Sequence, residues 1–426
     1  MKPLDPKQIL QAAGTANTNA AVIDKASENI PARKATLLLI AALTIMSGAT
    51  IAPSLPAIEA HFATTENAGL LTRLVLTLPA LFIAFCAPFA GDLADRFGRR
   101  PLLIGSIVLY GFAGISGLAL SALNELLIGR ALLGVAVAGT MTTATALVGD
   151  YFSGPERDRF MGLQAAFIGV GGLVFLTSGG LLADFHWRAP FAVYGLAFML
   201  LPAVILFINE PSRAPSAPTM VSNRSASDRP QAIIALLFAV AILNSVVFYL
   251  IPTQLPFYLQ SLGIEAPSRA GLAIGLLNLG STCMALAYAR VRQRVGITGM
   301  FAIGFALMTI GYWLVAAAAS YAIIVLAIAI TGIGMGAIMP NLMAGTMLVA
   351  PAEFRGRAAG GLTASIFLGQ FLSPLVSQPW IESFGFAATF RDMGLLLAAT
   401  AVAAAAAAAY LAYSPNMAKA IDSTGR

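Results

Sequence analysis

The sequence predicts an all-α integral membrane protein with twelve transmembrane helices arranged as two pseudo-symmetric halves of six. Of the 426 residues, 58% are apolar and only 10% are charged, whereas roughly a quarter of the residues in soluble domains are charged. The apolar residues gather in runs of about 20, the length that a membrane-spanning helix needs. A repeat of the sequence at a fixed offset predicts the division into halves.

The runs are longer than barrel strands of about ten residues and lack strict alternation, so we expect helices. Residues 35–208 and 231–413 hold six runs each, and residues 209–230, rich in proline and serine, are expected to form a flexible cytoplasmic linker. Residues 1–34 lack an apolar core and a cleavage pattern, which predicts a disordered cytoplasmic tail and not a signal peptide. Residues 414–426 form a second tail. The expected helices span 35–58, 69–90, 101–121, 125–149, 160–183, 189–208, 231–259, 269–288, 299–319, 321–349, 358–380 and 391–413.

The basic residues lie mainly on one side of the predicted membrane. The tails and the loops after even-numbered helices carry 20 of the 25 lysines and arginines, whereas the opposite side carries Arg188, Arg269 and Arg391. This asymmetry places both termini in the cytoplasm. We therefore expect a multi-pass protein of a bacterial inner membrane, whose net charge of +6 faces lipid headgroups and not nucleic acid.

The sequences of the two halves align without gaps when one constant offset is added to the residue numbers of the first half. This offset carries Gly98 onto Gly296. The shift pairs the end of the loop after helix two with the end of the loop after helix eight, and it continues without gaps across five helices. Six helices used twice are typical of transporters built around a central cavity. The paired residues include Arg96 and Arg294, Gly98 and Gly296, Gly134 and Gly332, Arg157 and Arg355, and Gly171 and Gly369.

A short, charged loop between helices two and three carries the most specific motif. It contains Gly91, Asp92, Asp95, Arg96, Gly98, Arg99 and Arg100. The segment resembles the cytoplasmic loop signature of the major facilitator superfamily, Gly-x-Leu-Ala-Asp-Arg-x-Gly-Arg-Arg. The resemblance extends over all twelve helices and implies an alternating-access transporter, similar to the drug:proton antiporter branch.

The resemblance gives this loop a gating role. It implies that Asp95 faces the positive N-terminal end of helix eleven, near Ala358, and that Arg99 pairs with Asp150 and Glu156. These contacts would close the cytoplasmic side when the cavity faces outward. Gly91 would allow close helix packing, and Gly98 would allow the turn. The alternative is that the charges only anchor the loop at the headgroups.

Two arginines lie inside predicted helices, and each has two interpretations. Arg130 resembles the arginine of a second family motif, although Leu133 replaces its glutamine, and the resemblance implies proton coupling. The alternative is a structural bond to backbone carbonyls of the N-terminal half. Arg73 either joins Arg130 in a positive site for an organic anion or extends its side chain to the headgroups.

Helix five carries Gly162, Gly171, Gly179 and Gly180 at the spacing of the family's antiporter motif, but Phe175 and Leu176 replace its Gly-Pro pair. The partial match favours export, while the remaining glycines also suffice as close helix contacts.

Acidic residues and both histidines lie at predicted helix ends, and Cys86 and Cys283 are isolated, so we expect no metal, cofactor or enzymatic activity. We expect a monomer that is driven by the proton gradient. Polar, aromatic and thioether side chains predict a binding cavity, with about half of the candidates facing it. The candidates are Met46, Gln164, Asn244, Phe248, Tyr249, Gln254, Asn278, Asn341, Phe367 and Gln370.

Two functions remain from the sequence. One is proton-coupled efflux of drugs or small metabolites. The other is import or exchange of a small organic anion, which a positive site at Arg73 and Arg130 would favour. A receptor would need a signalling domain, and an ATP-driven pump would need a phosphate-binding loop, and neither pattern occurs in the sequence.

Overall fold

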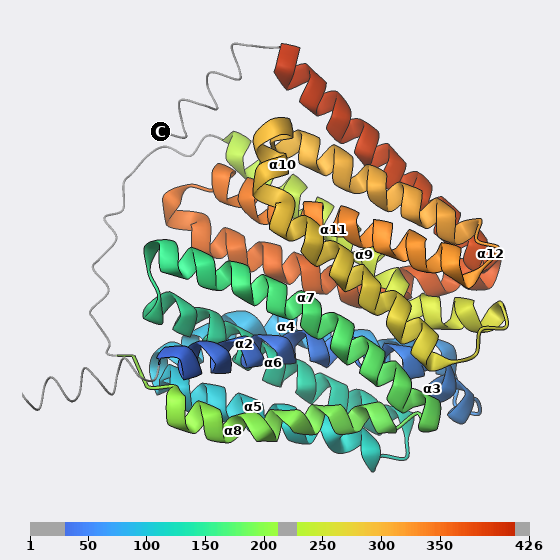
Figure 1. Cartoon of the computed structure of the whole chain (residues 1–426), viewed down its shortest axis with the longest axis horizontal. Helices are drawn as coiled ribbons and strands as arrows, with labels where there is room; N and C mark the ends of the chain where they lie inside the picture. Colours follow the sequence, from blue (N-terminus) through green and yellow to red (C-terminus); the bar gives the residue numbers. More distant parts are fainter. Residues whose placement is uncertain (1–29, 212–227, 414–426) are drawn as a thin grey trace, which may run out of the picture.

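The structure, a computed structural model, describes residues 30–211 and 228–413. Within these ranges the secondary structure is entirely helical. The predicted C-terminal tail, most of the predicted N-terminal tail and most of the predicted linker lie outside the described residues. Figure 1 shows the helices up to α8 gathered in the lower part of the view and those from α9 onward in the upper part.

The helices of the N-terminal half follow the predicted order. The first span is interrupted near Pro53 and Pro56, which cannot donate backbone hydrogen bonds. The elements are α2 (Ile30–Ala49), η1 (Ala52–Ser54), α3 (Leu55–His61), α4 (Ala68–Phe97), α5 (Arg99–Ile115), η2 (Ser116–Leu118), α6 (Leu123–Tyr151), α7 (Gly154–Phe185), η3 (Ala189–Gly195) and α8 (Leu196–Phe207).

The first helix begins earlier than we expected. Residues 30–34, assigned to the N-terminal tail from the sequence, form the start of α2. Their polar side chains have partners there, since the guanidinium of Arg33 lies 4.6 Å from the centre of the Tyr151 ring and Lys34 pairs with Glu156.

The C-terminal half contains two very long helical segments that each bend at a glycine. Gly296 and Gly385 have non-helical backbone angles, with φ of 71° and 80°. The described residues contain ten segments long and apolar enough to span a membrane, and dividing α10 and α12 at these glycines gives the predicted twelve. The elements are α9 (Asp228–Ser261), α10 (Pro267–Ala316), α11 (Tyr321–Val349), η4 (Ala352–Phe354) and α12 (Arg355–Tyr413).

The constant offset between the halves also relates their backbones. Gly98 ends α4 with φ of 98°, and its equivalent in the second half, Gly296, breaks α10 with φ of 71°. Such angles are strained for any residue with a Cβ atom. The glycines are therefore retained at the same turn of each half.

A second pair of glycines repeats a helix contact. A Cβ atom on Gly134 would collide with the backbone of Pro79, and a Cβ atom on Gly332 would collide with the backbone of Leu277. Pro79 and Leu277 are themselves paired by the same offset. The packing of α6 on α4 is thus reproduced by α11 on α10.

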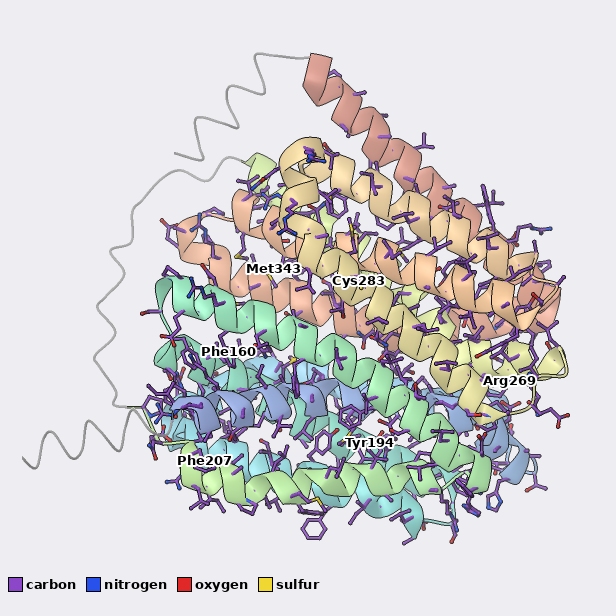
Figure 2. The ribbon with its side chains drawn as sticks, in the orientation of Figure 1. Phe160, Tyr194, Phe207, Arg269, Cys283 and Met343 are labelled. Atoms are coloured by element: carbon purple, nitrogen blue, oxygen red, sulfur yellow. The ribbon has the colours of Figure 1, made fainter. Side chains whose placement is uncertain are left out.

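The two ends of the helix bundle carry different loops. We call the end with Gly98 and Gly296 the loop end, and the end with Glu59 and Pro267 the far end. In Figure 2, Phe160 and Phe207 lie toward the loop end and Arg269 lies at the far end.

Candidate functional site

A cavity of about 250 Å³ lies between the two halves. Three helices from each half line it: α2, α4 and α7 on one side, and α9, α10 and α12 on the other. Its walls are mainly aliphatic and aromatic, and none of the described lining residues is charged. The polar lining residues are Thr44, Ser47, Tyr249, Asn278 and Gln370.

Half of the side chains that the sequence suggested for a cavity do line this one. They are Phe248, Tyr249, Asn278, Phe367 and Gln370. Tyr249 reaches across to α2, where its hydroxyl lies 2.9 Å from the position that a Cβ atom on Gly48 would take. The cavity is therefore narrow between α2 and α9.

The other five candidates are not among the residues that line this cavity. Met46 is fully buried in the hydrophobic core. Asn341 accepts a hydrogen bond from the Tyr288 hydroxyl at 2.9 Å and donates to the carbonyl of Ile297 at 2.8 Å, so its amide joins helices. Buried amides need such partners. The remaining three are Gln164, Asn244 and Gln254.

Arg73 lies at the far end of the interface between the halves, and its side chain is 3% exposed. Its Nη1 donates to Glu59 Oε2 at 2.5 Å and to the carbonyl of Gly69 at 2.6 Å. Its guanidinium lies 3.8 Å from the centre of the Phe257 ring on α9. Arg73 therefore does not extend to the headgroups, and a carboxylate already compensates its charge.

Gln254 connects this arginine to the C-terminal half. The Arg73 Nε donates to Gln254 Oε1 at 2.9 Å, and Gln254 Nε2 donates to Ser377 Oγ at 3.1 Å. Gln378 extends the network to Glu382 at 2.8 Å. We call Glu59, Arg73, Gln254 and Gln378 the far-end network. It joins α3 and α4 to α9 and α12.

Asp184 provides a second polar contact between the halves at the far end. Its Oδ1 accepts a hydrogen bond from the backbone N–H of Ser268 at 3.0 Å. Ser268 is in the first turn of α10, where N–H groups lack partners within the helix and favour a negative charge. The end of α7 is thereby fixed to the start of α10.

Glycines bring α7 and α10 together over the far half of their length. A Cβ atom on Gly180 would approach Pro267 O at 2.8 Å, and one on Gly172 would approach the Asn278 side chain at 3.0 Å. The side chain of Thr282 likewise fills the position that a Cβ atom on Gly169 would take. Contacts of this kind require small residues.

The same two helices separate toward the loop end. Apart from its own turn of helix, no atom lies within 4 Å of the position of a Cβ atom on Gly162, one of the four predicted helix-five glycines. Gly171 makes only ordinary contacts, whereas Gly179 packs against the backbone of Thr50 and Gly180 against α10. At this contact between the halves, α7 and α10 are thus closely packed toward the far end and apart toward the loop end.

The loop between α4 and α5 is held by Glu210, which the sequence did not single out. Its two oxygens accept hydrogen bonds from the backbone N–H groups of Arg99 and Arg100, each at 2.8 Å. The carboxylate therefore satisfies the N-terminus of α5. Gly98 has φ of 98°, so glycine is needed there for its backbone angle, and a Cβ atom would lie only 3.2 Å from the Glu210 carboxylate.

The expected arginine contact in this loop is present in part. Arg99 forms an ion pair with Asp150 at the end of α6. Glu156 does not take part, because it pairs with Lys34 of α2 at 2.7 Å. Gly91 makes no close helix contact in this structure, since the nearest atom to a Cβ there is Thr142 Cγ2 at 3.9 Å, and its packing role remains a prediction.

The acidic side chains of the loop, Asp92 and Asp95, are exposed, and so is Arg96. The proposed contact of Asp95 with the start of helix eleven remains a prediction.

Arg130 lies inside the N-terminal half and not in the cavity. It is fully buried, and its Nη2 donates to the carbonyl of Gly114 at 3.1 Å. Its guanidinium lies 4.9 Å from the ring centres of both Phe191 and Tyr194. Such contacts with backbone carbonyls are those expected if Arg130 has a structural role, the alternative to proton coupling. Arg73 and Arg130 share no contact partner, so the expected joint positive site is not formed.

Several residues of the far-end contacts were not predicted. Gln378 and Ser377 carry no distinctive motif, and Gly169 and Gly172 fall between the glycines of the family pattern. Spacing along α7 offers a signal for the glycines, because Gly169, Gly172 and Gly180 recur at helical intervals.

Comparison with known proteins identifies one family for both halves of the chain. The chain matches the family described as Major Facilitator Superfamily over residues 37–298 and again over 237–424. The two overlapping matches together cover most of both halves.

Two curated relatives and one solved structure illustrate the similarity. The chain is 28% identical to the tetracycline resistance protein, class C, of Escherichia coli over 76% of this chain and 84% of that protein. It is 25% identical to multidrug resistance protein 1 of Bacillus subtilis over 73% of this chain and 82% of the relative. The inward open xylose transporter XylE from E. coli superimposes with a TM-score of 0.71 at 14% identity, covering 87% of this chain and 94% of that one.

Proposed function

This chain belongs to the major facilitator superfamily of secondary transporters, and from that premise we propose that it exports small, largely apolar compounds in exchange for protons. The cavity between the halves carries this proposal. Three helices of each half line it, so a rocking motion of one half against the other would expose it to each side of the membrane in turn.

The cavity lining favours uncharged or weakly polar ligands with aromatic groups. Phe248, Tyr249 and Phe367 offer ring surfaces, while Asn278 and Gln370 offer amides for hydrogen bonds. A carboxylate placed here would lose its hydration without gaining a cationic partner. The names of the two relatives, which denote tetracycline and multidrug resistance, support efflux of such compounds.

An organic anion carrier is the less favoured alternative. It required Arg73 and Arg130 in one site, but Arg73 pairs with Glu59 and Arg130 donates to backbone carbonyls of α5. Neither residue lines the cavity. The geometry thus removes the main argument for anion binding.

The direction of the open side follows from charge. The loop end carries most of the basic residues, including Arg96, Arg99, Arg157 and Arg294. The positive-inside rule therefore assigns this end to the cytoplasm. With α7 and α10 apart at that end, we infer an inward-facing state, from which a compound would be taken up from the cytoplasm or the inner leaflet.

A binding experiment tests the ligand class. We expect the purified protein to bind chloramphenicol, an uncharged aromatic compound, more tightly than benzoate by at least about tenfold, a difference of about 1.4 kcal/mol. Gly48→Leu should weaken chloramphenicol binding, because the added side chain meets Tyr249 and fills the cavity. Gly105→Leu is the matched control, since no atom lies within 4 Å of that position. Tighter binding of benzoate, or equal binding by Gly48→Leu and Gly105→Leu, contradicts the proposal.

A further inference from the structure

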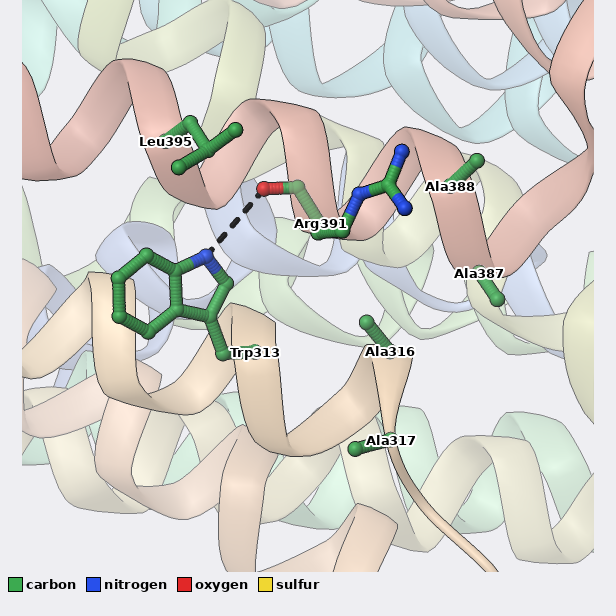
Figure 3. A pocket seen from close by; sticks show the side chains of 7 residues that line it. All are labelled: Trp313, Ala316, Ala317, Ala387, Ala388, Arg391 and Leu395. Atoms are coloured by element: carbon green, nitrogen blue, oxygen red, sulfur yellow. Dashed lines mark hydrogen bonds between the residues drawn. The ribbon is translucent and has the colours of Figure 1, made fainter.

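A second hollow lies on the surface of the C-terminal half, away from the central cavity. It has a volume of about 470 Å³ and lies between the end of α10 and the second segment of α12. Ala316 and Ala317 form one wall, and Ala387 and Ala388 form the other. Figure 3 shows the indole of Trp313 and the side chain of Arg391 on the two facing helices. We call this hollow the alanine groove.

The position of the groove determines what can fill it. Both walls are at the far end of membrane-spanning segments, close to where α10 ends at Ala316 and where α12 bends at Gly385. Trp313 is 42% exposed beside the groove, as is usual for tryptophan at the boundary between headgroups and hydrocarbon. Water is unfavourable against alanine walls. An apolar chain from the bilayer is therefore the natural occupant.

Arg391 gives the groove a polar end. Its side chain is 64% exposed, and it lies six residues beyond Gly385, or about 9 Å along a helix that rises 1.5 Å per residue. Its Nε donates to Asp392 Oδ1 at 3.1 Å. Among the described residues, its two terminal nitrogens have no hydrogen-bond partner. The terminal nitrogens are therefore free to donate to an anion or to water from the exposed side.

A phosphate matches these terminal nitrogens. The planar guanidinium can donate two parallel hydrogen bonds to two oxygens of one phosphate group. Phosphates line the membrane boundary at the level that a long arginine side chain can reach. An uncharged apolar compound would cover the alanines but would offer no acceptor to the two terminal nitrogens of the guanidinium, since only Nε is bonded to Asp392.

We propose that the alanine groove binds one membrane phospholipid, with an acyl chain along the four alanines and the phosphate on the Arg391 guanidinium. The site is separate from the transport cavity, because the two share no lining residue. It stabilises the contact between α10 and the last segment of α12, where Trp313 Nε1 already donates to the carbonyl of Arg391 at 3.3 Å.

Fluorescence quenching of Trp313 tests this site. The chain has three tryptophans, so Trp187→Phe with Trp380→Phe leaves Trp313 as the reporter. The full-length protein in detergent is titrated with phosphatidylcholine that carries bromine on its acyl chains, and separately with diacylglycerol that carries the same chains. We expect half-quenching at a concentration roughly two- to fivefold lower for the phospholipid, the range of an exposed charge contact.

Two variants locate the contact. Arg391→Gln should abolish the difference between the two lipids, whereas Arg269→Gln, an exposed arginine at the same end but outside the groove, should preserve it. Ala387→Leu should weaken quenching by both lipids, because its side chain occupies the groove. If both lipids half-quench Trp313 at the same concentration in the Trp187→Phe, Trp380→Phe protein, the proposal is overturned, and the quenching comes from unspecific lipid around the protein. An unchanged difference in Arg391→Gln also overturns it.

Native mass spectrometry provides a second measurement that keeps all three tryptophans. We expect one phospholipid to remain bound to the unmodified protein and to Arg269→Gln, and to be lost from Arg391→Gln. Equal retention by all three proteins contradicts the site. A dimer of the unmodified chain that carries no phospholipid also contradicts it.

Discussion

Two buried arginines of similar appearance in the sequence have different surroundings in the structure. Arg130 donates to backbone carbonyls within one half, so its contacts are preserved when the halves move. Arg73 donates across the interface to Gln254, so that contact must break when the far end opens. Burial alone marked both residues. Only the positions of their partners separate a structural arginine from one at the moving interface.

Glu59→Gln tests the charge balance at Arg73. The variant leaves a buried cation without its carboxylate, which costs about 3–5 kcal/mol for fully buried pairs. Because Glu59 is about a third exposed, we expect a smaller loss of stability, roughly 2–3 kcal/mol. The thermal unfolding midpoint of the purified protein measures it. The double variant Arg73→Met with Glu59→Gln should recover most of the loss, and a double variant no more stable than Glu59→Gln alone would refute the explanation.

The ion pair between Arg99 and Asp150 is tested by a double-mutant cycle. Both side chains are about a quarter exposed. We therefore expect the free energies of unfolding of Arg99→Ala and Asp150→Ala to be coupled by about 0.5–1 kcal/mol. Arg99→Ala and Glu156→Ala should be additive, because Glu156 contacts Lys34 instead. Coupling with Glu156 as large as with Asp150 would count against the observed geometry.

Asp95→Asn tests the gating role that the loop motif implies. If the carboxylate holds the start of helix eleven when the loop end closes, the variant should lose most transport while reaching the membrane at normal levels. Uptake by vesicles, normalised to the amount of protein, measures this loss. Normal transport by Asp95→Asn would exclude the gating role.

At the scale of elements, the contact between α7 and α10 reports the state of the molecule. The contacts run from Gly180 with Pro267 to Gly169 with Thr282, and they end before Gly162. The two helices therefore diverge along their length. Closing the loop end would bring Gly162 toward α10, while opening the far end would separate Gly180 from it.

Leucine at these two glycines should have opposite effects. Gly180→Leu would collide with the backbone of α10 and should hold the far end open, whereas Gly162→Leu is tolerated here and should hold the loop end open. Distances between spin labels report both ends after Cys86 and Cys283 are replaced. Suitable label pairs are Phe185 with Glu265 at the far end and Asp158 with Gln293 at the loop end. The same distance change in both leucine variants would contradict this account of the two helices.

The elements were predictable from the sequence to a greater extent than the site. Long apolar runs and the internal repeat predict the helices, because hydrophobic length and periodicity are local properties. The cavity depends on which helix faces which. Phe248 and Gln370 line it, but Asn341 turns to Ile297 and Gln254 turns to Arg73. Nothing in the neighbouring sequence distinguishes these amides, so only the tertiary packing separates them.

At the scale of the whole molecule, the distribution of charge predicts the orientation. A reporter at Pro267, at the far end of α10, should be external, and a reporter at Ser222, which lies outside the described residues, should be cytoplasmic. Fusions whose activity depends on the compartment measure both positions. An external signal from Ser222 would reverse the assignment of the loop end.

The central claim is that the molecule exports uncharged or weakly polar compounds from the loop end by proton exchange. Uptake of radiolabelled chloramphenicol by everted membrane vesicles tests it most directly, because the cytoplasmic side of such vesicles faces the medium. We expect uptake only with a proton gradient, its loss on adding a protonophore, and its loss in Gly48→Leu but not in Gly105→Leu. Uptake that persists without the gradient, or proton-driven uptake of benzoate and not of chloramphenicol, would contradict the account.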